Sequence, residues 1–372
     1  MRFIIIILFP FLIVTSSLSQ VSDTDWYVYR GKPDLSGRTE YELPSLPVLL
    51  WSVSTGVRTK SSPVLSDGTV FFGNDKGTLM AISIDGRIKW RFEAKNSIEA
   101  PPLVYNKKVI FGSTDGVLRA VDIVSGKLLW SYPTENQISG SANVWKTGNK
   151  AGIIVGSYDY YLHCVDPETG KLMWKVESDN YINGTPAVSN KSIVFGGCDG
   201  IIRIVDPLTG KQKDTVDIGI YIAASPAIDK DFACFGDYDG TVYYLNLITK
   251  KMIWKVQSSG ESGSIMAIPA IGNNMIIIGN ENKYLYCYNA TDGKTKWKYR
   301  TNGRINGSAV ITPTKVLFGS TDGNVYLLRL QDGKKLWSFN TGAQVSSSPA
   351  VTKGRFYFLT EDGRLLAFGI KN

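Results

Sequence analysis

Tryptophan recurs through the chain at intervals of about 40 residues, and this period restricts the possible folds more than any other feature. The intervals are 39, 40, 44, 80, 43 and 40 residues between seven positions: Trp51, Trp90, Trp130, Trp174, Trp254, Trp297 and Trp337. Within the interval of 80, "IVDPLTGKQKD" at 204–214 aligns with the segments around the other tryptophans, and Asp214 stands at the tryptophan position. The sequence therefore contains eight repeats of a small unit.

Each repeat is predicted to form four short strands. A small residue before proline or alanine precedes the first strand, as in "GTPAV" at 184 and "SSPAV" at 347. The second strand ends before an Asp-Gly turn, as in "IFGSTDG" at 110, where glycine supplies the positive φ of a tight hairpin. Four-stranded units at this period predict an all-β fold, the β-propeller.

The two ends of the repeat array predict how the ring closes. The final repeat contributes three strands, and "VLLWSV" at 48–53 supplies the missing fourth strand. Pairing the first strand with the last removes the open sheet edges of the array. We therefore expect an eight-bladed propeller as one domain at 47–372, preceded by a lead-in segment at 20–46.

The first residues have the pattern of a secretory signal peptide. Arg2 is followed by 13 apolar residues and then by small residues at Ser17 and Ser19, which predicts a signal at 1–19 that is removed after Ser19. The apolar run is short for a membrane span. We expect an exported protein, periplasmic or extracellular, with no membrane span in the mature chain. Because no cysteine follows the cleavage site, lipid anchoring is not expected.

Charge and cysteine content exclude several classes of function. The net charge of +8 is spread along the chain without a basic run or a nucleic-acid-binding module, so nucleic acid is not an expected partner. The four cysteines lie at least 34 positions apart and form no Cys-x-x-Cys pair, which argues against a zinc site. Three of them lie in strand-like apolar runs, so free and mostly buried thiols are expected.

The repeated segment resembles a known motif. "AVDIVSGKLLW" at 120–130 and "CVDPETGKLMW" at 164–174 are similar to the tryptophan-docking motif of the eight-bladed quinoprotein-type propellers, the family of pyrroloquinoline-quinone (PQQ)-like repeats. The resemblance implies that each tryptophan stacks on the next blade's turn and forms a joint of the ring. A buried indole also needs an acceptor for its N–H. Asp214 then predicts one weaker joint, with the loosest packing at 204–216.

The family that the repeated segment resembles includes dehydrogenases that use PQQ with calcium. Such enzymes usually show an adjacent pair of cysteines, a Glu/Asn/Asp calcium set and a catalytic aspartate, but this chain has no adjacent cysteines. Aspartate recurs at one turn of most repeats, where it suits turn formation, at Asp75, Asp115, Asp159, Asp199, Asp239, Asp322 and Asp362. We expect no catalytic residue, no cofactor and no metal. The alternative is a PQQ-dependent dehydrogenase of alcohols or sugars.

The single histidine and its neighbours form the most aromatic turn. His163 lies in the predicted strand of "GSYDYYLHC", beside Tyr158, Tyr160 and Tyr161. A histidine within a strand and without a visible partner favours a structural role. Tyrosines clustered on a loop are a possible contact surface, although packing within the fold is the preferred interpretation.

The connections between blades vary in sequence, whereas the tryptophan segments that join the blades stay constant. Variation on a constant frame favours the connections as the functional surface. We expect partner or ligand contacts in these connections at one mouth of the channel: Arg58, Lys60, Glu99, Gln137, Tyr181, Asn183, Tyr221, Glu261, Met266, Arg304, Asn306 and Gln344. Arg58, Lys60 and Arg304 come from the first and seventh connections and are expected to form a basic patch.

The preferred interpretation is an exported, non-catalytic and monomeric propeller that binds a protein partner in the cell envelope. It resembles the BamB-like propeller of outer-membrane β-barrel assembly. Besides the dehydrogenase, a binder or sensor of a small ligand in the central funnel stays open. Carboxylates converging in the funnel would favour the enzyme, and a closed polar pocket would favour the binder.

Overall fold

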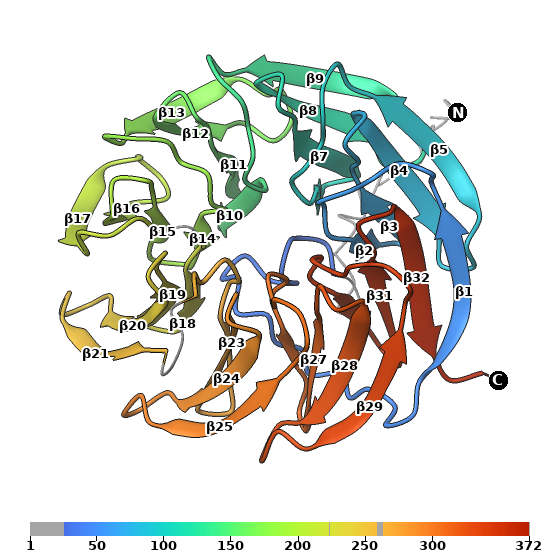
Figure 1. Cartoon of the computed structure of the whole chain (residues 1–372). Coiled ribbons are helices and arrows are strands. Elements are labelled where there is room, and N and C mark those ends of the chain that lie inside the picture. Colours follow the sequence, from blue (N-terminus) through green and yellow to red (C-terminus); the bar gives the residue numbers. More distant parts are fainter. Residues whose placement is uncertain (1–25, 223, 259–262, 372) are drawn as a thin grey trace, which may run out of the picture.

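The computed structural model describes residues 26–222, 224–258 and 263–371. The predicted signal peptide at 1–19 and Glu261 lie outside these residues. In the described part, eight four-stranded antiparallel sheets form a ring, and no helix long and apolar enough to cross a membrane is found. Figure 1 shows the sheets as blades around a central channel, with the first strand beside the last.

The strand bounds follow the repeats, and we number the blades from the first complete unit. Blade 1 comprises β2 (Val64–Ser66), β3 (Thr69–Phe72), β4 (Thr78–Ser83) and β5 (Ile88–Glu93), and blade 2 comprises β6 (Leu103–Tyr105), β7 (Lys108–Gly112), β8 (Val117–Asp122) and β9 (Leu128–Pro133). Blade 3 comprises β10 (Asn143–Thr147), β11 (Lys150–Gly156), β12 (Tyr161–Val165) and β13 (Leu172–Glu177), and blade 4 comprises β14 (Ala187–Val188), β15 (Ile193–Gly196), β16 (Ile201–Val205) and β17 (Gln212–Asp217).

Blades 5 to 8 repeat this order from the channel outwards. Blade 5 comprises β18 (Ala227–Asp229), β19 (Phe232–Gly236), β20 (Thr241–Asn246) and β21 (Met252–Gln257), and blade 6 comprises β22 (Ala270–Gly272), β23 (Met275–Gly279), β24 (Tyr284–Asn289) and β25 (Thr295–Arg300). Blade 7 comprises β26 (Val310–Ile311), β27 (Lys315–Gly319), β28 (Asn324–Arg329) and β29 (Lys335–Asn340), and blade 8 comprises β30 (Ala350–Thr352), β31 (Arg355–Leu359), β32 (Arg364–Gly369) and β1 (Val48–Ser54).

The predicted closure is confirmed. β1 is the outer strand of blade 8 and pairs antiparallel with β32, from Val48 opposite Gly369 to Ser54 opposite Arg364. Strands β3 and β4 of blade 1 are almost wholly buried, and most residues of the other blades' middle strands are buried except in β8, whereas outer strands such as β5 alternate between exposed and half-buried residues. The core therefore lies between neighbouring blades, as expected for stacked sheets.

Tryptophan docking is observed at five joints in the predicted form. The indole nitrogens of Trp51, Trp90, Trp130, Trp254 and Trp297 donate to a backbone carbonyl of the next blade's turn, over 2.8–3.1 Å. At four of these joints the ring lies so close to the turn that a Cβ on its glycine would come within 2.6–2.7 Å of the indole. Only glycine fits there, and its φ is positive, which explains the glycine of the motif.

Two joints depart from this form. Trp174 stacks on Gly210, but its indole nitrogen is buried and has no hydrogen-bond partner among the described residues. Trp337 faces blade 8, whose outer strand comes from the other end of the chain, so no turn links that strand to β32. Its ring instead packs edge-on against Phe356 and Phe368, with centroids 6.1 and 5.6 Å away.

The lead-in segment lies across the channel. Its backbone carbonyls accept hydrogen bonds from the inner strands of six blades: Trp26 from Leu65, Tyr27 from Val104, Pro33 from Val188, Asp34 from Ile228, Ser36 from Ile271 and Gly37 from Ile311. Arg30 is 1% exposed, and its guanidinium donates to the Pro269 and Ala309 carbonyls. The segment thus joins the inner strands from the inside of the ring, as its place in the centre of Figure 1 shows.

Candidate partner-binding face

The connections between blades lie on one face together with the second hairpin turn of each blade. One hydrogen bond recurs in all eight blades: an N–H of this turn donates to a carbonyl of the connection that enters the blade, over 2.9–3.1 Å. Examples are Tyr158 to Gln137, Cys198 to Tyr181 and Tyr238 to Tyr221. The bond gives each connection the same position over its blade, so we call this side the connection face.

The contact residues predicted from the sequence, as far as the structure describes them, occupy two positions that recur among the connections. The accepting position contains Arg58, Gln137, Tyr181, Tyr221, Arg304 and Gln344. The position two residues later contains Lys60, Glu99, Asn183, Met266 and Asn306. The intervening residue is buried in each connection, as Ile138 and Ile182 are, and in seven of the eight it packs on the glycine at the end of the preceding blade's second strand. This alternation anchors the connection and leaves the residues named at the two predicted positions half-buried or exposed.

The three predicted cations each have an acidic neighbour. Arg58 lies 3.7 Å from Glu361, Lys60 lies 2.8 Å from Glu99, and Arg304 lies 3.4 Å from Glu281. The hydrogen bond from Lys60 to Glu99 raises the pKa of the lysine. The three cations of the expected basic patch are therefore all in ion pairs, Arg58 and Arg304 with turn carboxylates and Lys60 with Glu99 of the next connection.

Tyrosines gather on the connection face over blades 3 to 5. Tyr158 stacks on Tyr181 with centroids 4.7 Å apart, and Tyr160 lies 5.2 Å from Tyr181. Tyr221 packs against Tyr238 at 5.6 Å, and the Asn183 amide donates to the Tyr221 hydroxyl over 2.6 Å. We call these five residues the tyrosine patch. Tyr160, Tyr181 and Tyr238 are 42%, 37% and 53% exposed, so the patch presents aromatic rings to solvent.

Tyr160 has an unfavourable backbone conformation. Its φ is 73°, in the left-handed region, at the turn position where six other blades have glycine, such as Gly116 and Gly200. A bulky residue in this region costs of order 1–2 kcal/mol relative to glycine. The ring therefore stands on the connection face at a cost in stability, and Lys283 of blade 6 has the same conformation, with a φ of 71°, at the equivalent position.

His163 is structural, as the sequence favoured, and it has partners that the sequence did not reveal. It is 3% exposed, its Nε2 lies 3.0 Å from Asp159 Oδ2, and its Nδ1 lies 3.0 Å from the Tyr132 hydroxyl. Burial opposes ionisation of Asp159, but the hydrogen bond with His163 lowers the pKa of the carboxyl. Arg119 and Arg203 bind the corresponding aspartates of blades 2 and 4. These acids are thus paired within their own blades.

The cysteines are free and mostly buried, as expected from the sequence. Cys164, Cys234 and Cys287 are buried free thiols, and burial raises the pKa of Cys164 and Cys287 to about 12. Among the described residues, no group of three or more His, Cys, Asp or Glu side chains could hold a metal ion.

The ring of docked tryptophans, the four-stranded blades and the lead-in together define an eight-bladed propeller of PQQ-like repeats. The family model described as outer membrane protein assembly factor BamB matches residues 48–151, 137–216 and 198–372, and the chain belongs to this family.

Individual relatives agree with this assignment. BamB of Moranella endobia (strain PCIT) is 31% identical over an alignment of 100 residues that covers 22% of this chain and 26% of that protein, so the match spans about a quarter of the relative. The crystal structure of BamB from Moraxella catarrhalis is 18% identical, with a TM-score of 0.73 over 87% of this chain and 100% of that one. Quinohemoprotein alcohol dehydrogenase from Comamonas testosteroni is 15% identical, with a TM-score of 0.78 over 94% and 81%. The two structures show the fold.

Proposed function

We propose that this chain is an exported, non-catalytic scaffold that binds a protein partner in outer-membrane protein assembly through the tyrosine patch. The observation that carries the proposal is the strained Tyr160, stacked with Tyr181 on an exposed face. Tyrosine is enriched at protein interfaces because a large rigid ring with one polar tip gives contact area at a low cost in conformational entropy. The family to which the chain belongs supports the kind of partner.

The proposal treats the propeller as monomeric and without a cofactor. The inner-strand N–H groups of six blades are bound by the lead-in, which occupies the channel at that level. Turn aspartates in blades 2, 3 and 4 pair with residues four positions later, such as Asp115 with Arg119, so their carboxylates do not converge on one cation. These arrangements do not fit PQQ with calcium at the turns.

Site-specific photocrosslinking tests the partner. Tyr181 is replaced by p-benzoylphenylalanine in the producing cell, and Ile253, an exposed residue on outer strand β21, carries the same group in a matched control. We expect an adduct with an outer-membrane assembly component from position 181 and not from position 253. Equal adducts from both positions, or none from 181, would contradict the proposal.

Titration of the mature chain with PQQ and calcium tests the non-catalytic part. Tryptophan fluorescence reports binding, and dye reduction with alcohols or sugars reports turnover. We expect no saturable change and no reduction. Saturable binding with turnover would establish the dehydrogenase instead, whatever the crosslinking shows.

A further inference from the structure

The joint between blades 4 and 5 differs from the other joints on both of its sides. Asp214 occupies the tryptophan position, opposite Ile204 in the same register that places Trp174 opposite Cys164. In the turn of blade 5, Lys250 occupies the position that is glycine in the equivalent turns, and its φ of 58° preserves their backbone conformation. Lys250 Nζ lies 2.9 Å from Asp214 Oδ2. An ion pair thus replaces the stack of indole on glycine.

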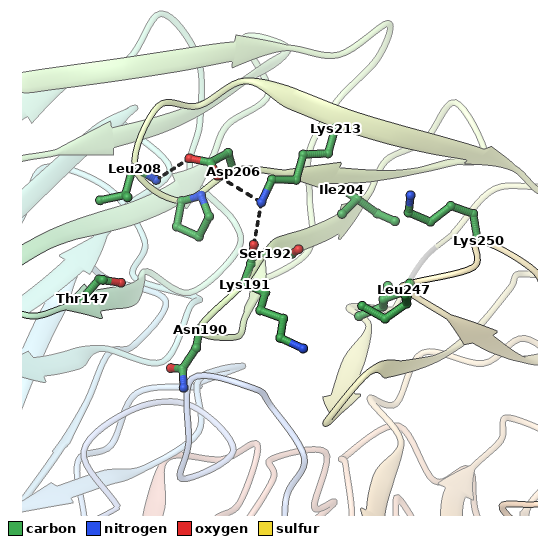
Figure 2. A pocket seen from close by; sticks show the side chains of 12 residues that line it. Thr147, Asn190, Lys191, Ser192, Ile204, Asp206, Leu208, Lys213, Leu247 and Lys250 are labelled. Carbon is green, nitrogen blue, oxygen red and sulfur yellow. Dashed lines mark hydrogen bonds and ion pairs between the residues drawn. The ribbon is translucent and has the colours of Figure 1, made fainter.

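A pocket lies beside this joint, and Ile204, Leu247, Ile248 and Lys250 are among the residues that line it. The pocket has a volume of about 490 Å³, within the usual range for small-ligand sites. Its apolar floor is formed by Ile204 and Leu247, which are 1% and 7% exposed. Leu208 and Ile248 contribute exposed apolar side chains at the rim. Figure 2 labels Ile204 and Leu208 of blade 4 and Leu247 of blade 5 among the side chains that line the pocket.

The lysines of the pocket are held in place by acids and a carbonyl. Lys213 Nζ lies 3.0 Å from Asp206 and donates to the Lys191 carbonyl over 2.8 Å, as Figure 2 shows. Lys250 is bound by Asp214. Because these ammonium groups are already paired, the pocket has little excess charge with which to select an anion. Fixed cations at the edge of an apolar floor are instead suited to the face of an aromatic ring.

We propose that this pocket binds an aromatic side chain, tryptophan above all, presented by a partner polypeptide. The five closed joints identify the occupant, because in each an indole reaches the corresponding turn and donates to a carbonyl one or two residues after the third strand. The corresponding carbonyl in blade 5 is that of Leu247, and Asp214 offers it no N–H donor at that position. A tryptophan from outside would complete the joint. The site is separate from the tyrosine patch and does not depend on it.

N-Acetyl-L-tryptophanamide serves as the probe, with N-acetyl-L-leucinamide as the matched aliphatic control. Isoleucine and leucine methyl groups are labelled in the mature chain, and their NMR shifts are followed during titration. An indole in the pocket shifts Ile204, Leu247 and Ile248 through its ring current. We expect saturable shifts with a Kd on the order of 1 mM for the tryptophan probe, and none that saturate for the leucine probe.

Two variants locate the site. Asp214→Trp with Lys250→Gly rebuilds the joint from the chain's own residues, so the probe should bind at least tenfold more weakly. Ile248→Glu changes an exposed rim residue, leaves the floor intact, and should also weaken binding. Absence of saturable shifts in the unaltered chain, equal binding of the leucine probe, or unchanged affinity in Ile248→Glu would each overturn the proposal. Photocrosslinking at Tyr181 is not affected by any of these outcomes.

Discussion

A comparison of Trp130→Phe with Trp174→Phe measures what the indole hydrogen bond contributes to a joint. Both rings stack on a glycine, and a Cβ on Gly170 or Gly210 would lie 2.6 or 2.7 Å from the ring. Trp130 donates to the Pro167 carbonyl over 3.1 Å, whereas the Trp174 nitrogen is buried and has no partner among the described residues. Phenylalanine removes the same atoms at both positions.

The expected difference follows from the two hydrogen-bond states. Trp130→Phe loses a net bond of about 1 kcal/mol, while Trp174→Phe removes an unsatisfied buried N–H whose desolvation costs about 1–3 kcal/mol. The packing loss is similar at the two joints and largely cancels. Trp130→Phe should therefore lower the free energy of unfolding by about 2–4 kcal/mol more than Trp174→Phe.

Urea denaturation followed by far-UV circular dichroism gives both free energies, because the backbone signal does not depend on the altered tryptophan. Coincidence with a second probe, such as the fluorescence of the remaining tryptophans, checks that unfolding is two-state. Losses equal within about 0.5 kcal/mol, or a larger loss in Trp174→Phe, would refute the reasoning, since Trp174 would then have an acceptor after all.

Three further predictions concern other parts of the ring. Amide hydrogen exchange should be faster at 204–216 than in outer strands such as β9 (Leu128–Pro133) and β25 (Thr295–Arg300), because the pocket replaces a docked indole; equal rates would exclude a weaker joint. Tyr160→Gly should raise the free energy of unfolding by about 1 kcal/mol and reduce crosslinking from position 181; loss of stability would show that the ring is not strained. Burial opposes ionisation of Glu42, but hydrogen bonds from Lys315 and Thr314 lower the pKa of this carboxyl below 4.5. Its contribution to stability is therefore present above that pH and lost as the pH falls through the lowered pKa, so proteolysis of the lead-in should increase on acidification in the unaltered chain and change less in Glu42→Gln.

The sequence predicted the features that every blade must share. Eight blades, closure by 48–53 and the docking of most tryptophans follow from the 40-residue period, because each joint needs the same indole, glycine and carbonyl. The sequence did not predict the path of the lead-in. Its contacts are backbone carbonyls of an irregular segment, as at Tyr27 and Pro33, and these leave no periodic pattern in side chains.

The sequence indicates part of the two unusual sites, the joint at Asp214 and the turn at Tyr160. The alignment that places Asp214 at a tryptophan position also places Lys250 at a glycine position, so both partners of this ion pair depart from the repeat. Likewise Tyr160 stands in the glycine column of the turns, a departure that signals strain at a positive φ. The ion pairs of Arg58 and Arg304 were not predicted, because their acids belong to turns distant in the chain.

Departures from the repeat are the places where function can be distinguished from architecture in this molecule. A joint that loses only its tryptophan would expose glycine and an unpaired carbonyl, but here Asp214 and Lys250 change together and bind each other, so the turn keeps its backbone conformation. At Tyr160 the turn likewise keeps its backbone conformation, although the glycine that would favour this conformation is absent. Both departures, together with the unpartnered Trp174, lie in blades 3 to 5. The five docked joints and the packing of Trp337 on blade 8 hold the rest of the ring together, so we expect these three blades to carry aromatic sites without loss of the fold.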